Sequence, residues 1–521
     1  MQWTLLLAAS AVAVAFTPSA AAQAPLGAQV TIHAGRPGAA INPDVFGQFS
    51  EHLGRGIYGG IWVGKDSKIP NTDGFRNDVI AALKALRVPV VRWPGGCFAD
   101  GYHWRNGIGP EDQRPVTVNS NWGGVAEPNS FGTDEFMKFV KMIGAKAYIN
   151  GNLGTGTPAE MSNWLDYLSS DQDTTLERLR AANGHKAPYK VAFWAIGNES
   201  WGCGGDMRPQ YYVDLFRRYS TFLQAPPGVR PLIVASGGHD ADGPRWTKAL
   251  ITDGGMDVGA ISYHYYTIPS PTRDWQHKGP ATNFPESQWI STLVNALEMN
   301  TYIEANIKIM DQYDPDKRVG FFVDEWGTWY DPQPGPNPRL LFQQNTIRDA
   351  VVAAATLDIF AQHAARVRMA NIAQTVNVLQ AMILTDGRKM LLTPTYHVFK
   401  MYIPFQGATH LPTDVDTPDY RYGKMSVPAI SVTAARDARG ALVYALTNLD
   451  PDRGIDVSTT IDGAHLSSVS GAILTGPKMD SHNTFADPDA VHPVVFDGAS
   501  LSGGELKVML PPKSVVVLTL K

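Results

Sequence analysis

Short apolar runs recur eight times between residues 41 and 402. Their residues are apolar at successive positions, which is typical of parallel strands covered on both faces. The runs are residues 45–49, 89–93, 147–149, 191–196, 232–235, 258–263, 319–323 and, more weakly, 370–373. Several gaps between them have the apolar spacing of a helix, so strands and helices alternate. This order predicts a (β/α)8 TIM barrel at residues 41–402.

Four segments between these runs carry a clear helical pattern. Three of them place on one face Phe75, Val79, Leu83 and Leu86, then Phe136, Phe139, Val140 and Ile143, then Met161, Trp164, Leu165 and Leu168. The fourth is a long helix predicted over residues 340–365. We expect Thr133 or Asp134 to cap the second helix and Gly144 to end it.

The composition of the chain changes after about residue 402. Short segments rich in Val, Ile, Thr and Leu, at residues 429–434, 441–446, 469–474 and 515–520, are separated by turn-forming clusters. This pattern predicts an antiparallel, jelly-roll-like β-sandwich at residues 403–521. A strand within residues 24–40 has no partner in the barrel, so we expect it to join the sandwich.

The first residues resemble a targeting signal. Residues 5–16 form a largely apolar run too short to span a bilayer, and small residues follow at 20–24. We interpret residues 1–22 as a signal peptide, which predicts a secreted or periplasmic protein. However, no Lys or Arg precedes the apolar run. No later segment predicts a transmembrane helix, so we expect no membrane partner.

The overall composition limits the partners of the protein. The chain has 521 residues, of which 44% are hydrophobic and 18% charged, enough for a large core in two or three domains. A formal net charge of -5 gives no reason to expect nucleic acid. Cys97 and Cys203 are the only cysteines, and they either form a disulfide or remain separate thiols. No metal-ligand spacing or dinucleotide motif occurs, so we expect no metal and no cofactor.

Polar and aromatic residues gather where the predicted strands end. Glu199 and Glu325 each follow an apolar run closely, and the C-terminal ends of barrel strands converge on one face. The same face is expected to carry Glu51, Arg92, Asn198, His264, Tyr266 or its neighbour Tyr265, Trp329 and Gln374. Hydrolysis of a glycosidic bond requires one protonated and one ionised carboxyl group. Glu199 and Glu325 are the natural pair.

The two glutamates need different surroundings for this chemistry. Arg92, if it reaches Glu325, would favour the ionised form of a nucleophile. Trp194 and Trp201 lie close to Glu199 in the sequence and would favour its protonated form. Taken singly, an Asn-Glu pair after a strand is often only a helix cap, and a buried Arg is often a structural ion pair.

Four motifs together resemble glycoside hydrolase family 51, the α-L-arabinofuranosidases. They are AIGNES around Glu199, VDEWGTWY around Glu325, and the longer segments at residues 46–60 and 91–110. The likeness extends from about residue 41 to the C-terminus. It implies a retaining barrel enzyme in which Glu199 is the acid/base and Glu325 the nucleophile.

The same resemblance implies how the substrate is held. Sugar or carboxylate contacts would come from Glu51, Arg92, Asn198, Tyr266 and Gln374, and Trp122 and Trp329 would line the cleft. We include His264, from its strand end, and Cys97 among the substrate-binding candidates. Many family members have Asn at the position of Cys97, and a thiol is a poorer hydrogen-bond partner than an amide.

The resulting hypothesis is an exo-acting, retaining α-L-arabinofuranosidase that removes terminal arabinofuranosyl residues from plant polysaccharides or oligosaccharides. It predicts carboxyl groups about 5 to 5.5 Å apart. The alternatives are a β-glycanase or β-xylosidase on the same barrel and, from another class, a non-catalytic polysaccharide-binding protein. A homo-oligomer is expected by family analogy only.

Overall fold

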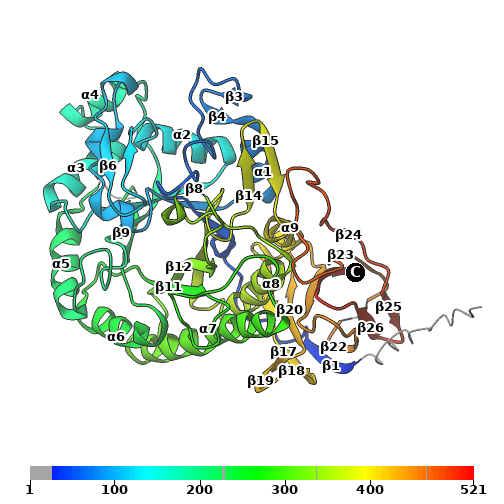
Figure 1. Cartoon of the computed structure of the whole chain (residues 1–521). Coiled ribbons are helices and arrows are strands. Elements are labelled where there is room, and N and C mark those ends of the chain that lie inside the picture. The colour runs from blue at the N-terminus through cyan, green and yellow to red at the C-terminus, as the bar shows by residue number, and fades with distance from the viewer. Residues whose placement is uncertain (1–25, 226–228, 336, 465) are drawn as a thin grey trace, which may run out of the picture.

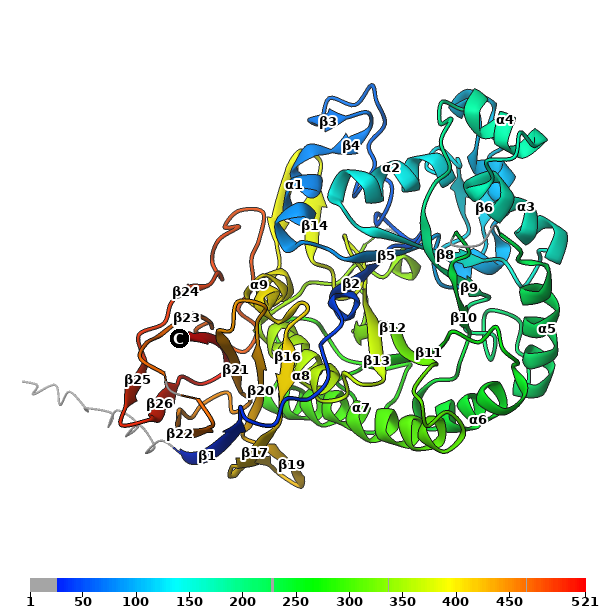
Figure 2. The same ribbon diagram turned by 180° about the vertical axis from the view of Figure 1, so that it is seen from behind.

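The computed structural model describes residues 26–225, 229–335, 337–464 and 466–521. Eight parallel strands close into a barrel (Figure 1), in the order β10-β11-β12-β13-β2-β5-β8-β9 (Figure 2). These strands are β2 (Gly47–Phe49), β5 (Val90–Trp93), β8 (Lys146–Gly151), β9 (Val191–Ile196), β10 (Leu232–Ala235), β11 (Ala260–Thr267), β12 (Gly320–Thr328) and β13 (Val367–Ala373). Each overlaps one of the eight apolar runs, so the barrel prediction is confirmed.

Helices surround the barrel. Those that match the predicted segments are α1 (Asn77–Leu86), α2 (Thr133–Ile143), α3 (Pro158–Ser169) and α8 (Ile347–Gln362). The described residues also form α4 (Thr175–Ala182), α5 (Pro209–Phe222), α6 (Gly243–Asp253), α7 (Glu286–Tyr313) and α9 (Pro394–Met401). Across the described residues, no helix combines the length and apolar character that crossing a bilayer requires.

Two predicted helix starts are wrong, and one predicted end is confirmed. Residue Gly132, rather than Thr133 or Asp134, caps α2, and its N–H is bonded to the Glu135 carboxylate at 2.9 Å. A side chain at Gly132 would lie 1.8 Å from the Gly107 carbonyl oxygen, so the tight packing there requires glycine. The long helix begins at Ile347 rather than residue 340, after a cap by Thr346. Gly144, with φ 77°, ends α2 as expected.

The barrel interior is divided into an apolar and a polar part. Its lower layers are filled by Val90, Tyr148, Ala195, Val234, Ala260, Phe322 and Met369, with Phe193 packed against them. Arg92, His264 and Glu325 lie nearer the C-terminal strand ends and are buried. A packed apolar floor therefore supports a layer of charged side chains.

The C-terminal part of the chain forms two packed sheets (Figure 2). One sheet has the order β17 (Thr413–Asp416), β1 (Leu26–His33), β22 (Ile455–Asp462), β26 (Glu505–Leu510), β25 (Ala499–Ser502). The other has the order β16 (Thr409–Leu411), β20 (Ile430–Arg436), β21 (Leu442–Asn448), β27 (Ser514–Leu520), β23 (Val469–Leu474), β24 (Val494–Val495). All four strand segments predicted here lie in this second sheet. The N-terminal strand β1 pairs in parallel with β22, from Leu26 with Ile455 to His33 with Asp462.

Helix α8 joins the barrel to the sandwich. It is buried from Ile347 to Ala361 and contacts β20, β21 and β27. In this interface the Asp358 carboxylate accepts hydrogen bonds from the Tyr402 hydroxyl at 2.9 Å and the Ser431 hydroxyl at 2.6 Å. The domains are thus packed together through a helix that both of them share.

Four two-stranded hairpins extend from this frame within the described residues. They are β3 (Asn71–Thr72) with β4 (Phe75–Arg76), β6 (Thr117–Asn119) with β7 (Val125–Glu127), β14 (Ile383–Asp386) with β15 (Lys389–Leu392), and β18 (Asp419–Tyr422) with β19 (Met425–Pro428). Phe75, predicted as helical, belongs to β4. The turn between β6 and β7 carries Trp122 to the C-terminal end of the barrel, where it contacts Glu51.

Candidate active site

A cavity lies among the loops that follow the barrel strands. Its walls are formed by Glu51, Leu53, Gly96, Cys97, Trp122, Glu199, Tyr266, Glu325, Trp329, Leu341, Gln374 and Leu379. Eight of the predicted site residues are therefore at its surface: Glu51, Cys97, Trp122, Glu199, Tyr266, Glu325, Trp329 and Gln374. The other three lie behind them: Arg92 and His264 bond the carboxylates of Glu325 and Glu199, and Asn198 accepts a hydrogen bond from Arg92 Nη2 at 2.6 Å.

The two predicted catalytic carboxylates face each other. Glu199 follows β9, whereas Glu325 lies inside β12, in register with His264 of β11. One oxygen of Glu199 lies within 4.8 Å of one oxygen of Glu325. That separation fits retaining enzymes, with about 5 to 5.5 Å between carboxyl groups, better than inverting ones, which need about 6.5 to 9.5 Å.

Glu325 is surrounded by hydrogen-bond donors. Arg92 Nη1 donates to its Oε1 at 2.7 Å, and the Tyr266 hydroxyl donates to its Oε2 at 2.8 Å. Burial raises the pKa of Glu325, and the positive charges of His264 and Arg92 offset part of that rise. The donors stabilise the carboxylate form that a nucleophile requires.

Strand parity settles which tyrosine serves the site. Tyr266 points inward with His264, because alternate residues of β11 face the same side. The Tyr265 hydroxyl instead donates to the Asn295 carbonyl, and Arg273 lies over its ring. Tyr266 is therefore the residue that contacts Glu325.

His264 lies between three carboxylates. Its Nδ1 is 2.9 Å from Glu199 Oε1, and its Nε2 is 3.2 Å from Asp324 Oδ1. Burial lowers the pKa of His264, but the charge of Glu325 and the bonds to Asp324 and Glu199 overcome it and raise the pKa to about 10. Glu199, His264 and Glu325 have the spacing of a metal site. In its protonated form His264 has no free lone pair, and it bonds the carboxylates as a cation.

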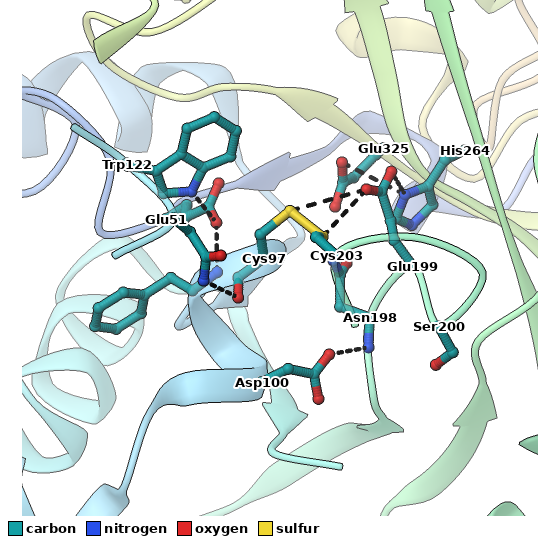
Figure 3. Close-up of a disulfide and its surroundings, with 12 residues drawn as sticks. Glu51, Cys97, Asp100, Trp122, Asn198, Glu199, Ser200, Cys203, His264 and Glu325 are labelled. Carbon is teal, nitrogen blue, oxygen red and sulfur yellow. Dashed lines mark hydrogen bonds and ion pairs between the residues drawn. A yellow bond between two sulfur atoms is a disulfide. The ribbon is translucent and has the colours of Figure 1, made fainter. Parts of the chain in front are cut away.

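Glu51 is held by a separate set of donors at the opposite wall (Figure 3). Its Oε1 accepts hydrogen bonds from the Phe98 N–H at 3.0 Å and the Trp122 indole at 2.7 Å. The Gln374 amide donates to its Oε2 at 3.2 Å. Burial and the charge of Glu325 raise the pKa of Glu51 to about 7, although the N–H donors act in the opposite direction.

Cys97 and Cys203 form a disulfide beside Glu199, which decides between the two states left open by the sequence. The sulfur atoms lie 3.9 Å and 3.5 Å from Glu199 Oε2. Neither sulfur carries a proton, so these are van der Waals contacts and not hydrogen bonds. Cys97 thus presents a disulfide sulfur to the cavity, not a thiol (Figure 3).

One of the two tryptophans expected to surround Glu199, Trp194, points away from it. The Trp194 ring packs against Trp164 of α3 at 5.4 Å, and Trp201 stacks on His239 at 3.8 Å. Ala195 faces the barrel interior. Because neighbouring residues of a strand point to opposite sides, the Trp194 side chain points outward. The nearest neighbours of the Glu199 carboxylate are instead His264 and the disulfide.

Several site residues carry no signal in the sequence. Leu53, Leu341 and Leu379 form an apolar wall of the cavity. They lie in three loops from separate parts of the chain. Asp324 directly precedes Glu325 in the sequence, but its role differs from that of Glu325. It accepts a hydrogen bond from Tyr148 at 2.7 Å and pairs with His264. Asp324 therefore balances charge beneath the cavity.

A closed TIM barrel with one buried and one partly buried carboxylate at this distance defines the site of a retaining glycoside hydrolase. Two family models match the chain: "Alpha-L-arabinofuranosidase 1 domain" at residues 82–278 and "Alpha-L-arabinofuranosidase C-terminal domain" at residues 324–514. The chain belongs to glycoside hydrolase family 51, the α-L-arabinofuranosidases.

Individual relatives support this membership over nearly the full length. An intracellular exo-α-L-arabinofuranosidase of Bacteroides ovatus is 45% identical, over 95% of this chain and 96% of its own. The family 51 arabinofuranosidase structure from Xanthomonas axonopodis pv. citri is 51% identical, with a TM-score of 0.93 over 95% of this chain and 100% of its own. The Thermotoga maritima α-L-arabinofuranosidase, solved as an arabinose complex, is 29% identical, with a TM-score of 0.80 over 95% of this chain and 99% of its own.

One comparison corrects the predicted location. The Bacteroides ovatus relative is named intracellular, which contradicts a secreted or periplasmic protein. The predicted signal peptide, residues 1–22, lies outside the described residues. Its apolar run lacks the preceding Lys or Arg of a typical export signal, so the run alone does not establish secretion.

Proposed function

We propose that Glu325 and Glu199 carry out the double displacement by which this α-L-arabinofuranosidase removes terminal arabinofuranosyl residues from arabinose-containing polysaccharides or oligosaccharides. The observation that carries the proposal is the approach of the two carboxylates to within 4.8 Å at the surface of one cavity. The name of the Bacteroides ovatus relative and the arabinose complex of the Thermotoga maritima relative support the substrate.

In the first step, a Glu325 carboxylate oxygen attacks the anomeric carbon. The bond to the leaving oxygen breaks, and Glu199 donates its proton to that oxygen, so the leaving group departs as a neutral alcohol. Arg92 and Tyr266 hold Glu325 in place for the attack through bonds of 2.7 Å and 2.8 Å. The product is a glycosyl ester on Glu325.

In the second step, the ionised Glu199 accepts a proton from water as the water oxygen attacks the anomeric carbon. The ester bond breaks and Glu325 leaves as a carboxylate, so two inversions give net retention. His264, which bonds Glu199 Oε1 at 2.9 Å, stabilises its charged form in this step.

The walls of the cavity and the name of the Bacteroides ovatus exo-α-L-arabinofuranosidase favour an exo-acting enzyme. Loops from separate parts of the chain surround the two carboxylates, as binding of a terminal sugar unit requires. Leu53, Leu341 and Leu379 form an apolar wall, while Glu51 and Gln374 offer polar groups to sugar hydroxyls. Trp122 and Trp329 are the aromatic surfaces against which the sugar would pack.

The test compares hydrolysis of nitrophenyl α-L-arabinofuranoside, β-D-xyloside and β-D-glucoside. The wild type should act on the arabinoside, whereas Glu199→Ala should lose about 10²- to 10⁴-fold in kcat, because hydrolysis of the ester lacks its base, and Glu325→Ala should lose still more. Activity on the xyloside or glucoside alone would overturn the substrate assignment.

Azide provides the control that separates the two roles. With Glu199→Ala, azide should trap the ester on Glu325 and give a glycosyl azide of retained configuration. With Glu325→Ala, azide should replace the missing nucleophile and give the inverted azide. Exchanged or identical stereochemistry in the two variants would contradict the roles.

Two further expectations stay predictions. The division of the chain at residues 402 and 403 stays a prediction, and so does a homo-oligomer, which rests on the family resemblance alone. Among the remaining candidate contacts, Arg92 and His264 are proposed to act through the carboxylates that they bond, and Asn198 through Arg92.

A further inference from the structure

Asp100 connects loops that follow three neighbouring barrel strands. It lies in a short 3-10 helix, Cys97–Gly101, that follows β5. Its Oδ1 accepts hydrogen bonds from the N–H groups of Leu153 at 2.8 Å and Gly154 at 2.9 Å, in the loop after β8. Its Oδ2 accepts a bond from the Asn198 N–H at 2.9 Å, after β9 (Figure 3). Asp100 is 5% exposed and does not line the cavity.

The surrounding backbone is built closely around this carboxylate. A Cβ at Gly204 would lie 2.8 Å from Asp100 Oδ2 and 1.8 Å from the Asn198 carbonyl oxygen. A Cβ at Gly154 would lie 2.9 Å from both Cβ and the carbonyl oxygen of Asp100. Both loops can approach Asp100 only because these positions are glycine.

The turn that Asp100 holds has an unfavourable backbone conformation. Gly197 has φ 81° and Glu199 has φ 41°, in the left-handed region that residues with a side chain rarely adopt. The Gly202 and Gly204 N–H groups donate to the Glu199 carbonyl at 2.7 Å and 3.1 Å, within the same loop. The bond from Asn198 to Asp100 ties this turn to the loop after β5. A conformation of this kind persists only where its surroundings fix it.

We propose that Asp100 is a positioning residue for the acid/base: by fixing the turn at Asn198, it holds the Glu199 carboxyl at the leaving-group oxygen. Asp100 makes no contact with the substrate and acts through Asn198. The inference rests on the role of Glu199 in the proposed function and adds a residue to it.

The experiment uses aryl α-L-arabinofuranosides that differ in how much they need protonation. Phenol is a poor leaving group and requires the acid, whereas 4-nitrophenol departs with little help. In Asp100→Asn, an NH₂ group replaces one acceptor oxygen and faces backbone N–H donors. We expect kcat/KM to fall at least tenfold more for the phenyl than for the nitrophenyl substrate.

Asp358→Asn is the matched control. Asp358 is also a fully buried carboxylate that accepts hydrogen bonds, but it lies in the barrel–sandwich interface. Its replacement should change the melting temperature without changing the ratio of the two substrates. A general loss of stability would behave like this control, so the ratio isolates positioning of the acid.

The outcomes separate this inference from the proposed function. The role of Asp100 alone is overturned if Asp100→Asn lowers kcat/KM equally for both substrates while Glu199→Ala lowers it much more for the phenyl substrate. An equal loss in Glu199→Ala overturns the acid/base assignment itself. If Asp100→Asn does not fold, Asp100→Ser, which keeps one acceptor oxygen in a smaller side chain, gives the same comparison.

Discussion

At the scale of single residues, the imidazolium of His264 sets the charge balance of the site. The imidazolium pairs with the carboxylates of Glu199, Asp324 and Glu325, and Arg92 supplies the second positive charge near Glu325. Two cations therefore lie among three acids in a buried layer. Removing either cation leaves negative charge without compensation.

Replacement of His264 should shift the pH dependence of catalysis. His264→Gln removes a positive charge that lowers the pKa of Glu325, so that pKa should rise. The acidic limb of kcat/KM against pH, which reports ionisation of the nucleophile, should move to higher pH, and kcat should fall about tenfold or more.

A surface histidine provides the comparison for this pH profile. His103 pairs with Glu160 at 2.9 Å and its side chain is 45% exposed. His103→Gln should leave the acidic limb in place. An unchanged acidic limb in His264→Gln would contradict the charge balance described for the site.

The sequence predicted those site residues whose chemistry is visible at strand ends. Glu199, Glu325 and Arg92 follow or end apolar runs, and barrel geometry brings such positions together. Asp100 could not be found in this way, because an Asp in a loop has no pattern and its partners are backbone N–H groups. The pairing of Cys97 with Cys203 depends on how two loops fold against each other, which their spacing does not reveal.

At the scale of elements, two helices end in the left-handed conformation with different residues. Helix α2 ends at Gly144, with φ 77°, and α1 ends at Arg87, with φ 53°. The space around Gly144 is open, and the Arg87 side chain is exposed. Comparing Gly144 with Arg87 therefore measures the free-energy cost of placing a side chain on a left-handed backbone.

The two ends should respond to substitution with opposite sign. Arg87→Gly should raise the melting temperature because glycine relieves the strain, and Gly144→Ala should lower it because alanine introduces strain. Each change corresponds to about 1 kcal/mol, measured by thermal unfolding at fixed scan rate. A shift of the same sign in both variants would show that contacts other than backbone strain decide these ends.

Strands were easier to predict than the details of their connections. A strand buried on both faces must be apolar throughout, so each of the eight barrel strands left a readable run. Helix starts were misplaced where packing overrides local preference, as at Gly132, which is dictated by Gly107 on another loop. The short hairpin of β6 and β7 has no apolar core of its own and left no readable pattern, although its turn carries Trp122.

At the scale of the whole molecule, Asp358 lies in the contact between barrel and sandwich. Burial raises its pKa to about 7, although the Ser431 and Tyr402 hydroxyls act in the opposite direction. The pKa in the folded state is above the ordinary value of 3.8, so ionisation opposes folding. The stability contributed by the neutral acid is complete below about pH 4 and is lost as the pH rises through about 7.

Asp358→Asn should therefore change the pH dependence of stability. The variant keeps a neutral side chain at every pH, so its melting temperature relative to wild type should rise between pH 5 and pH 8. The difference corresponds to a few kcal/mol. A constant difference across this range would contradict ionisation of Asp358 in the interface.

The pairing of β1 with β22 makes the sandwich from both ends of the chain, with the entire barrel sequence between them. On the ribosome, β1 is synthesised first but acquires both of its neighbours, β17 and β22, only after the barrel has emerged. The last strand, β27, lies between β21 and β23 in the middle of its sheet. The second domain can therefore close only after β27 has emerged from the ribosome, and a chain that stops before β27 lacks the strand that joins β21 to β23.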